Sequence, residues 1–177
     1  MSGGLFAAAL LRETGRPVTP QLAEELQQHH GIGYSRQVSR VRPLPGAQQL
    51  LNSLTGIGVP WAIATSGRSD FAHKTLAVLN IAPEVVVITR DQVEHAKPDP
   101  DLFVAAAERL QVDIVNSIVV GDSVWDLLAA QRARALGIGL LSGGYGQDEL
   151  ERSGAYRVYQ DPLDLLRHLD EVGMRIT

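Results

Sequence analysis

The feature that most constrains the fold of this chain is the alternation, from residue 43 onward, of short apolar runs with amphipathic stretches. Short runs rich in Val and Ile predict buried strands, and the amphipathic stretches between them predict helices. Strands that are apolar throughout and separated by helices imply a parallel sheet covered on both faces. We therefore expect an α/β fold with a Rossmann-like, three-layer arrangement. The predicted strands are residues 59–65, 84–88, 117–120, 137–141 and 156–159, and the predicted helices are residues 47–54, 70–79, 99–110, 124–135 and 162–170.

The part of the chain before this alternation has a helical pattern without strands. It predicts helices at residues 5–12 and 20–37. The second of these has Thr19 as a plausible N-cap and Pro20 at its first position, where a proline costs no hydrogen bond. We therefore expect a separate helical piece ahead of the sheet.

A proline-rich segment, residues 41–46, separates the two patterns. Proline lacks the backbone N–H that a helix needs, so this segment cannot continue the preceding helix. We place a domain boundary here, with a helical piece at residues 1–42 and an α/β domain at residues 43–177. In parallel sheets of this kind ligands bind at the carboxyl ends of the strands, so candidate site residues are sought there.

The composition narrows the classes of function. The formal net charge is −4, with acidic and basic residues interspersed, which argues against a nucleic-acid or membrane-surface binder. Because there are no cysteines, disulfides, thiol catalysis and cysteine-based zinc sites are excluded. The apolar stretches are too short to span a bilayer, and the amino terminus lacks the pattern of a secretory signal. We expect a cytoplasmic protein that binds neither nucleic acid nor membranes.

The first candidate site is the end of the predicted strand 59–65, where the sequence continues as Thr65-Ser66-Gly67. A strand that ends in this way and leads into a helix supplies a hydroxyl and free backbone N–H groups, which suit phosphate oxygens. The alternative is an ordinary strand-to-helix turn in which Ser66 or Ser69 caps the helix.

The second candidate is Lys97, which precedes a turn containing two prolines and the predicted helix 99–110. The prolines rigidify the turn, and Asp99 or Asp101 can cap the helix behind it. The lysine ammonium is then placed where it can neutralise an anion in the cleft. The alternative is a solvated lysine on a loop.

The third candidate is the pair Asp122 and Asp126, at and just beyond the end of the predicted strand 117–120. A spacing of four residues puts Asp126 one helical turn along, roughly over Asp122. Two carboxylates in one cleft repel each other unless a cation lies between them, and oxygen ligands select a hard ion such as Mg²⁺. The alternative is that Asp122 caps the helix and Asp126 is a first-turn acid favoured by the helix dipole.

Taken in this order, the three sites resemble motifs two, three and four of the haloacid dehalogenase superfamily. The resemblance runs from residue 43 to the carboxyl terminus and makes the chain similar to phosphoglycolate-phosphatase-like members, with residues 5–37 resembling the later part of a helical cap domain. It implies a Mg²⁺-dependent phosphatase acting on a small phosphorylated metabolite. The roles it implies are catalysis by Thr65 and Lys97, phosphate binding by Thr65, Ser66, Gly67 and Lys97, and Mg²⁺ binding by Asp122 and Asp126.

The chain departs from the superfamily at motif one. In the family a central strand ends in Asp-x-Asp-Gly-Thr and supplies the nucleophile and the general acid/base, but no aspartate precedes Thr65 here. We therefore expect a sheet that lacks its central first strand, a cap that is only partly present, and little hydrolysis by this chain alone. Unpaired strand edges also favour self-association.

Other functions remain as alternatives. A phosphomutase shares these motifs with the phosphatases. A dehalogenase of the same superfamily needs no metal, so the Asp122 and Asp126 pair disfavours it. An alternative from a different class is a non-catalytic protein that binds phosphate or a partner chain.

Overall fold

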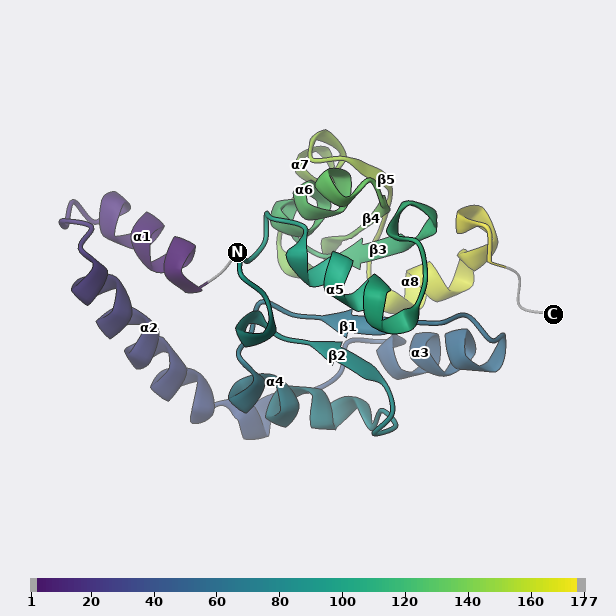
Figure 1. Ribbon diagram of the computed structural model, residues 1–177, viewed down its shortest axis with the longest axis horizontal. Helices are drawn as coiled ribbons and strands as arrows, with labels where there is room; N and C mark the ends of the chain where they lie inside the picture. The colour runs from purple at the N-terminus through teal and green to yellow at the C-terminus, as the bar shows by residue number, and fades with distance from the viewer. Residues whose placement is uncertain (1–2, 175–177) are drawn as a thin grey trace.

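The structure is a computed structural model that describes residues 3–174. Helices and strands alternate along most of this range (Figure 1). The α-helices are α1 (Gly3–Glu13), α2 (Pro20–Ser35), α3 (Ala47–Gly56), α4 (Ser69–Leu76), α5 (Asp101–Leu110), α6 (Val124–Ala133), α7 (Gln147–Arg152) and α8 (Pro162–Arg167). The strands are β1 (Ala62–Ala64), β2 (Val86–Ile88), β3 (Ile118–Gly121), β4 (Leu136–Leu140) and β5 (Ala155–Tyr159).

The order of strands and helices expected from the sequence is confirmed, with boundaries that shift by a few residues. Thr19 caps α2 as expected, because its hydroxyl accepts the N–H of Leu22 at 3.2 Å. The short helix α7 was not predicted. It lies in a glycine-rich stretch, and its few residues are too short a segment to show helical periodicity.

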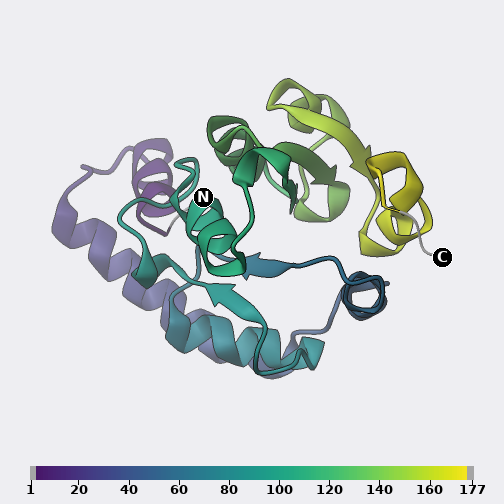
Figure 2. The same ribbon diagram turned by 45° about the vertical axis from the view of Figure 1, so that its right-hand side comes forward.

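The strands are parallel and belong to two separate sheets. One sheet has the order β1-β2, with Ile63 opposite Val87, and the other has the order β3-β4-β5. Within residues 3–174, β1 pairs only with β2, and β3 pairs only with β4. Figure 2 shows the two sheets as two groups of arrows. The facing edges of β1 and β3 therefore carry no backbone pairing to each other.

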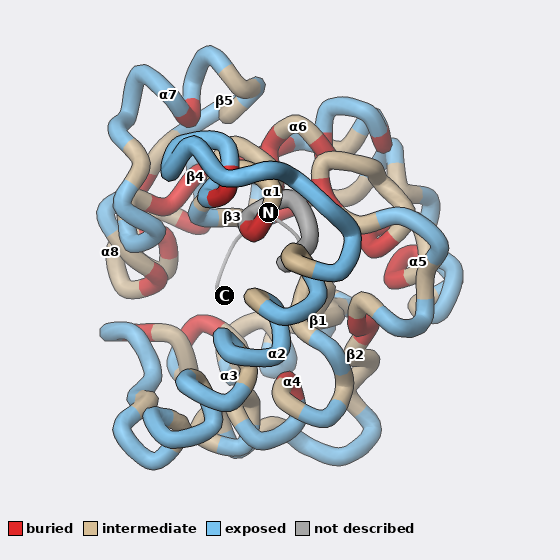
Figure 3. The backbone as a smooth tube through the Cα atoms, turned by 90° about the vertical axis from the view of Figure 1, so that its left-hand side faces the viewer, coloured by how far each residue is buried: buried red, intermediate tan, exposed pale blue. Residues whose placement is uncertain are grey.

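Helix α5 holds the two sheets together. Its Leu102 is fully buried and packs with Ile88 of β2, while the adjacent Phe103 packs with Val119 of β3. On the other sheet, helix α6 packs on β3 and β4. Figure 3 shows the buried positions gathered in these strands and helices. The burial of apolar side chains by α5 and α6 is the main force that fixes the strand ends relative to each other.

A third cluster of buried residues lies at the carboxyl-terminal side of the fold. There α3 packs against α8, and α8 contacts β5. At Gly46, just before α3, a Cβ would lie 2.4 Å from the Cα of Leu163, and the φ of this glycine is +74°. A glycine is needed here for both reasons. It lets the chain turn sharply into α3 against α8.

The amino-terminal helices form a hairpin that projects from the α/β body (Figure 1). Helix α2 has no buried residue and reaches the body near α4, where the Tyr34 and Thr75 hydroxyls hydrogen-bond at 2.8 Å. Residues 41–45 form neither helix nor strand, and the division into domains at this point stays a prediction. None of the described helices is long and apolar enough to cross a membrane.

Candidate functional site

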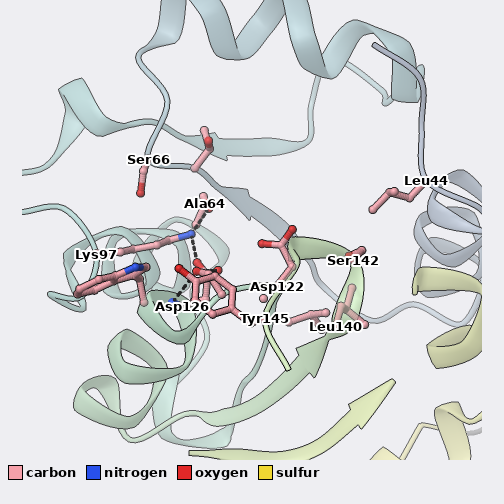
Figure 4. A pocket seen from close by; sticks show the side chains of 14 residues that line it. Leu44, Ala64, Ser66, Lys97, Asp122, Asp126, Leu140, Ser142 and Tyr145 are labelled. Atoms are coloured by element: carbon pink, nitrogen blue, oxygen red, sulfur yellow. Dashed lines mark hydrogen bonds and ion pairs between the residues drawn. The ribbon is translucent and has the colours of Figure 1, made fainter. Parts of the chain in front are cut away.

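A cleft of about 510 Å³ lies where the ends of β1 and β3 face each other (Figure 4). It is lined by residues that follow β1, β3 and β4, by the turn before α5 and by the start of α6. The three sites proposed from the sequence meet here, since Thr65, Lys97 and Asp122 all line the cleft. Parallel strands end at the same edge within each sheet, and α5, which packs on both sheets, holds the two edges close together.

Thr65 and Ser66 occupy the wall that follows β1. The Thr65 N–H donates to the Ile88 carbonyl at 2.9 Å, which extends the β1–β2 pairing by one residue. The Thr65 Oγ1 accepts the Gly67 N–H at 3.1 Å, so its own O–H is left to donate elsewhere. The Ser66 Oγ is buried and has no hydrogen-bond partner within residues 3–174. A buried hydroxyl in this state is costly, and a ligand oxygen in the cleft would relieve that cost.

Gly67 has a different placement from the one expected. It is not among the residues that line the cleft, and its N–H is already committed to Thr65. A Cβ at this position would lie 3.3 Å from the Thr65 Oγ1. The residue therefore shapes the turn that presents Thr65, and its position gives no support to direct phosphate binding.

The start of α4 is held by a loop and not by a serine cap. The N-cap residue is Arg68, without a side-chain hydrogen bond, so the alternative of capping by Ser66 or Ser69 is wrong. Asp91 takes this part instead: its carboxylate accepts the Ser69 N–H at 2.9 Å and also the hydroxyls of Ser69 and Thr89. These hydrogen bonds, with those from Ser69 first, hold the pKa of Asp91 well below its usual range.

Lys97 is buried, with its ammonium inside the cleft (Figure 4). The Nζ lies 2.7 Å from Oδ1 of Asp126 and donates to the Ala64 carbonyl at 2.9 Å. It also lies 4.8 Å from the centre of the Phe103 ring, a cation–π distance. The alternative of a solvated loop lysine is therefore wrong. A buried ammonium fixed by these contacts is suited to neutralising an anion.

The turn that carries Lys97 is fixed by a carboxylate, although not in the way expected. The N-cap of α5 is Pro100 without a side-chain hydrogen bond, so capping by Asp99 or Asp101 is wrong. Asp101 accepts the His95 N–H at 2.9 Å instead, and this closes the turn before the helix.

Asp126 is buried and is fully engaged by protein groups. One carboxylate oxygen contacts Lys97, and the other accepts the Ser123 hydroxyl at 2.6 Å. Burial by itself raises the pKa of Asp126, but Lys97 and Ser123 outweigh burial and leave the pKa below its usual range. Gly121 makes this position possible, because a Cβ there would lie 2.2 Å from the Asp126 Cβ. The residue predicted as a metal ligand is thus the partner of the cleft lysine.

Asp122 points into the cleft (Figure 4) and is exposed to solvent there. It does not cap α6, since the N-cap is Ser123. The surrounding protein removes part of its hydration, and this, followed by the negative charge of Asp126, raises its pKa. A carboxylate whose charge is disfavoured in this way is stabilised by a cation.

The donor set fits Mg²⁺ only in part. Residues 3–174 contain no group of three or more His, Cys, Asp or Glu side chains placed to hold a metal ion. Mg²⁺ usually keeps several waters and binds through one or two carboxylates together with substrate phosphate oxygens. Asp122 meets that pattern as a single protein ligand.

Several lining residues were not expected from the sequence. Tyr145 and Ser142 reach the cleft from the glycine-rich loop after β4. A Cβ at Gly143 would lie 1.9 Å from the Asp122 carbonyl oxygen, so only glycine allows this loop to approach so closely. Trp125 also lines the cleft, and its buried Nε1 has no hydrogen-bond partner in the described part of the chain. In the sequence, the feature that could have indicated Trp125 as a cleft residue is its position between Asp122 and Asp126.

Comparison with known proteins agrees with this fold. The family model described as haloacid dehalogenase-like hydrolase matches residues 6–134. The chain is 30% identical over 162 residues to a phosphoglycolate phosphatase from Caulobacter vibrioides, covering 90% of this chain and 66% of the relative. A crystal structure of a hydrolase from Pseudomonas syringae is 50% identical with a TM-score of 0.92, covering 97% of this chain and 79% of that one. This chain belongs to the haloacid dehalogenase-like hydrolases.

A second solved structure of this family is also similar to the chain. It is a haloacid dehalogenase family hydrolase from Deinococcus radiodurans with bound phosphate and sodium, 29% identical with a TM-score of 0.74. The similarity covers 94% of this chain and 74% of that chain. The first curated relatives are longer than this chain, which spans 66% or less of their length.

Proposed function

We propose that this chain holds the phosphate- and magnesium-binding part of a phosphatase site that acts on a small phosphorylated metabolite. The observation that carries the proposal is the meeting of Lys97, Thr65 and Asp122 in one cleft. Its hydrolase family and its phosphatase relatives support the same reaction class. The phosphate in the Deinococcus relative supports a phosphoryl group as the ligand.

The roles of the cleft residues follow from their contacts. The Lys97 ammonium neutralises phosphoryl oxygens, and the Thr65 and Ser66 hydroxyls donate hydrogen bonds to them. Donors fixed in advance stabilise the charge that develops in phosphoryl transfer without a cost for reorganisation. Ser66 gains most from a bound phosphate, because its hydroxyl otherwise stays buried without a partner.

The metal role falls mainly on Asp122 in this proposal. Both oxygens of Asp126 are engaged, so we assign to it the positioning of Lys97 and not direct ligation. A Mg²⁺ ion beside Asp122 would act as a Lewis acid toward the phosphoryl group. Asp122 supplies the hard oxygen ligand, and phosphate oxygens and water supply the remainder.

In this proposal neither aspartate of the cleft attacks phosphorus, because Asp122 is assigned to the metal ion. No aspartate precedes Thr65 in the sequence, and Asp126 is held by Lys97 and Ser123. We propose that a further parallel strand fits between the unpaired edges of β1 and β3 and supplies the nucleophile. Residues 1–177 alone then bind phosphate but hydrolyse esters slowly. The same open edges favour pairing with a second copy of the chain.

Phosphate binding by the isolated protein tests the proposal directly. Isothermal titration with orthophosphate should show binding that tightens when Mg²⁺ is added. Lys97→Met should abolish binding, whereas Lys74→Met, which changes an exposed lysine, is the matched control and should leave it unchanged. Asp122→Asn should remove only the effect of Mg²⁺. Equal binding by the Lys97→Met and wild-type proteins would overturn the proposed function.

A further inference from the structure

Arg132 lies near the carboxyl end of α6 and contacts the turn that carries Lys97. Its Nη1 donates to the Pro98 carbonyl at 3.0 Å and to Oδ1 of Asp99 at 3.1 Å. We propose that Arg132 is a positioning residue for Lys97 and that α6 thereby fixes both ends of this lysine. The inference rests on the proposed role of Lys97 in binding phosphate.

The geometry of α6 supports this proposal. Asp126, near its amino end, holds the Lys97 ammonium at 2.7 Å, while Arg132 holds the backbone next to Lys97. The two residues are six positions apart, which corresponds to about 9 Å along an α-helix. Because a helix is rigid over this length, the distance between the two anchors changes little. Lys97 is thus held between two fixed points of one element.

Arginine is suited to this contact. A guanidinium presents several N–H donors in a fixed plane, and here it reaches a backbone carbonyl and a carboxylate together. The Arg132 and Asp99 side chains are 50% and 47% exposed, so water screens their attraction. On the far side of the turn, Asp101 accepts the His95 N–H. Loss of Arg132 should therefore loosen the turn on one side without unfolding the protein.

The lysine content of the chain offers a direct readout. The sequence contains two lysines, Lys74 and Lys97. Lys74 is exposed, and Lys97 donates to Asp126 and Ala64 within the cleft. In protein labelled with ¹⁵N-lysine, the Lys97 ammonium should give a protected NMR signal, while that of Lys74 exchanges rapidly with water. The Lys97 signal reports on the position of the ammonium independently of any enzymatic activity.

The test compares three variants with the wild-type protein. Arg132→Gln should shift the Lys97 ammonium signal and speed its exchange, and should weaken orthophosphate binding about three- to fivefold, as expected for a half-exposed charged contact. Arg132→Lys keeps a cation and should restore part of both effects. Arg134→Gln removes a neighbouring exposed arginine that makes no ion pair in the described structure, and should change neither. Thermal melting confirms that each variant is folded.

Two outcomes separate this inference from the proposed function. If Arg132→Gln leaves the Lys97 signal and phosphate binding unchanged while Lys97→Met abolishes binding, the positioning role is wrong and the proposed function stands. If the wild-type protein binds no phosphate but Arg132→Gln still displaces the Lys97 signal, the proposed function fails and the positioning contact stands. Should Arg132→Gln not fold, Asp99→Ala removes one of the two acceptors from outside α6, and an unchanged Lys97 signal there overturns the proposal.

Discussion

At the scale of single residues, the ion pair between Lys97 and Asp126 is the central feature of the cleft. Both side chains are almost entirely buried, at 10% and 11% exposure. Removing one partner of such a pair leaves an uncompensated buried charge, which typically costs about 3–5 kcal/mol. Ser123 and the Ala64 carbonyl supply further hydrogen bonds that offset the desolvation of the pair. The Lys97 side chain is therefore held in place before any ligand arrives.

Asp91 gives a pH-dependent prediction at the same scale. Its folded-state pKa lies below the ordinary value of 3.8 because Ser69 and Thr89 donate to its carboxylate. A lowered pKa stabilises the fold fully above the unfolded-state value, and this contribution is lost as pH falls toward the folded-state value. Asp91→Asn should therefore lower the free energy of unfolding at pH 7, and the difference from wild type should shrink between pH 4 and pH 2. Urea unfolding across this range measures it.

Glu84→Gln is the control for this experiment. Glu84 is an exposed acid just before β2, and the described structure gives its carboxylate no hydrogen bond or ion pair. Its substitution should change stability little at any of these pH values. A difference between the Asp91→Asn and wild-type proteins that stays constant down to pH 2 would show that the carboxylate charge is not the cause.

At the scale of elements, the close contact of β3 with α6 places Asp126 over the end of the strand. Gly121 closes β3, and a side chain there would overlap with Asp126. The strand and the helix must therefore meet through a residue without a Cβ. The same device recurs at Gly143, where the loop after β4 lies against the backbone of Asp122. Gly121 and Gly143 thus allow β3, α6 and the loop after β4 to meet at the cleft.

Gly121→Ala should disturb both stability and the site. The added methyl group would push Asp126 away from Lys97, and overpacking of this kind typically costs about 1–3 kcal/mol. Chemical denaturation should show this loss, and the binding of orthophosphate should weaken. Gly33→Ala in α2 is the matched control, because a Cβ there meets no atom within 4 Å. It should be neutral or slightly stabilising, since alanine favours a helix more than glycine does. Equal stability of the two variants would contradict this account of Gly121.

At the scale of the whole molecule, the division of the sheet sets what the chain can do alone. β1 and β3 face each other without pairing, and α5 holds their two sheets together. Unpaired N–H and C=O groups on the edge of a parallel strand cost free energy when they are buried. When they are exposed, they can pair with strands of other chains. The place that is proposed for the nucleophile is therefore also a place where two strand edges lack a pairing partner within the described residues.

Residues 1–177 should hydrolyse p-nitrophenyl phosphate barely above background. Electrostatic clamping by Lys97 and a metal ion does not replace a carboxylate in line with phosphorus. Joining an amino-terminal segment that carries a strand and Asp-x-Asp-Gly-Thr should raise the rate by orders of magnitude. Sedimentation velocity should show less self-association in the extended protein, because its strand covers both open edges.

A single substitution separates the structural effect of that segment from its chemical effect. Replacing the first aspartate of the added motif by asparagine should preserve the gain in stability and the loss of self-association, but not the rate. A normal enzymatic rate from residues 1–177, abolished by Asp122→Asn, would show that the nucleophile already lies within this chain.

The sequence by itself determined the order of strands and helices, the parallel direction of the strands and the three candidate positions Thr65, Lys97 and Asp122. These features depend on local patterns, because apolar runs, helical periodicity and prolines act over a few residues each. Packing of α5 on both sheets then brings Thr65, Lys97 and Asp122 into one cleft.

Only the tertiary structure decided which contacts each of these side chains makes. The sequence placed Asp126 with Asp122 as a metal pair, but packing against α5 buries Lys97 beside Asp126, and the two charges satisfy each other. The serine caps considered for α4 are also wrong. The start of this helix is held by Asp91, which lies far from it in the sequence. A hydrogen bond between segments far apart in the chain leaves no local pattern. Its partner is set by the packing of whole elements, and that packing exists only once the chain has folded.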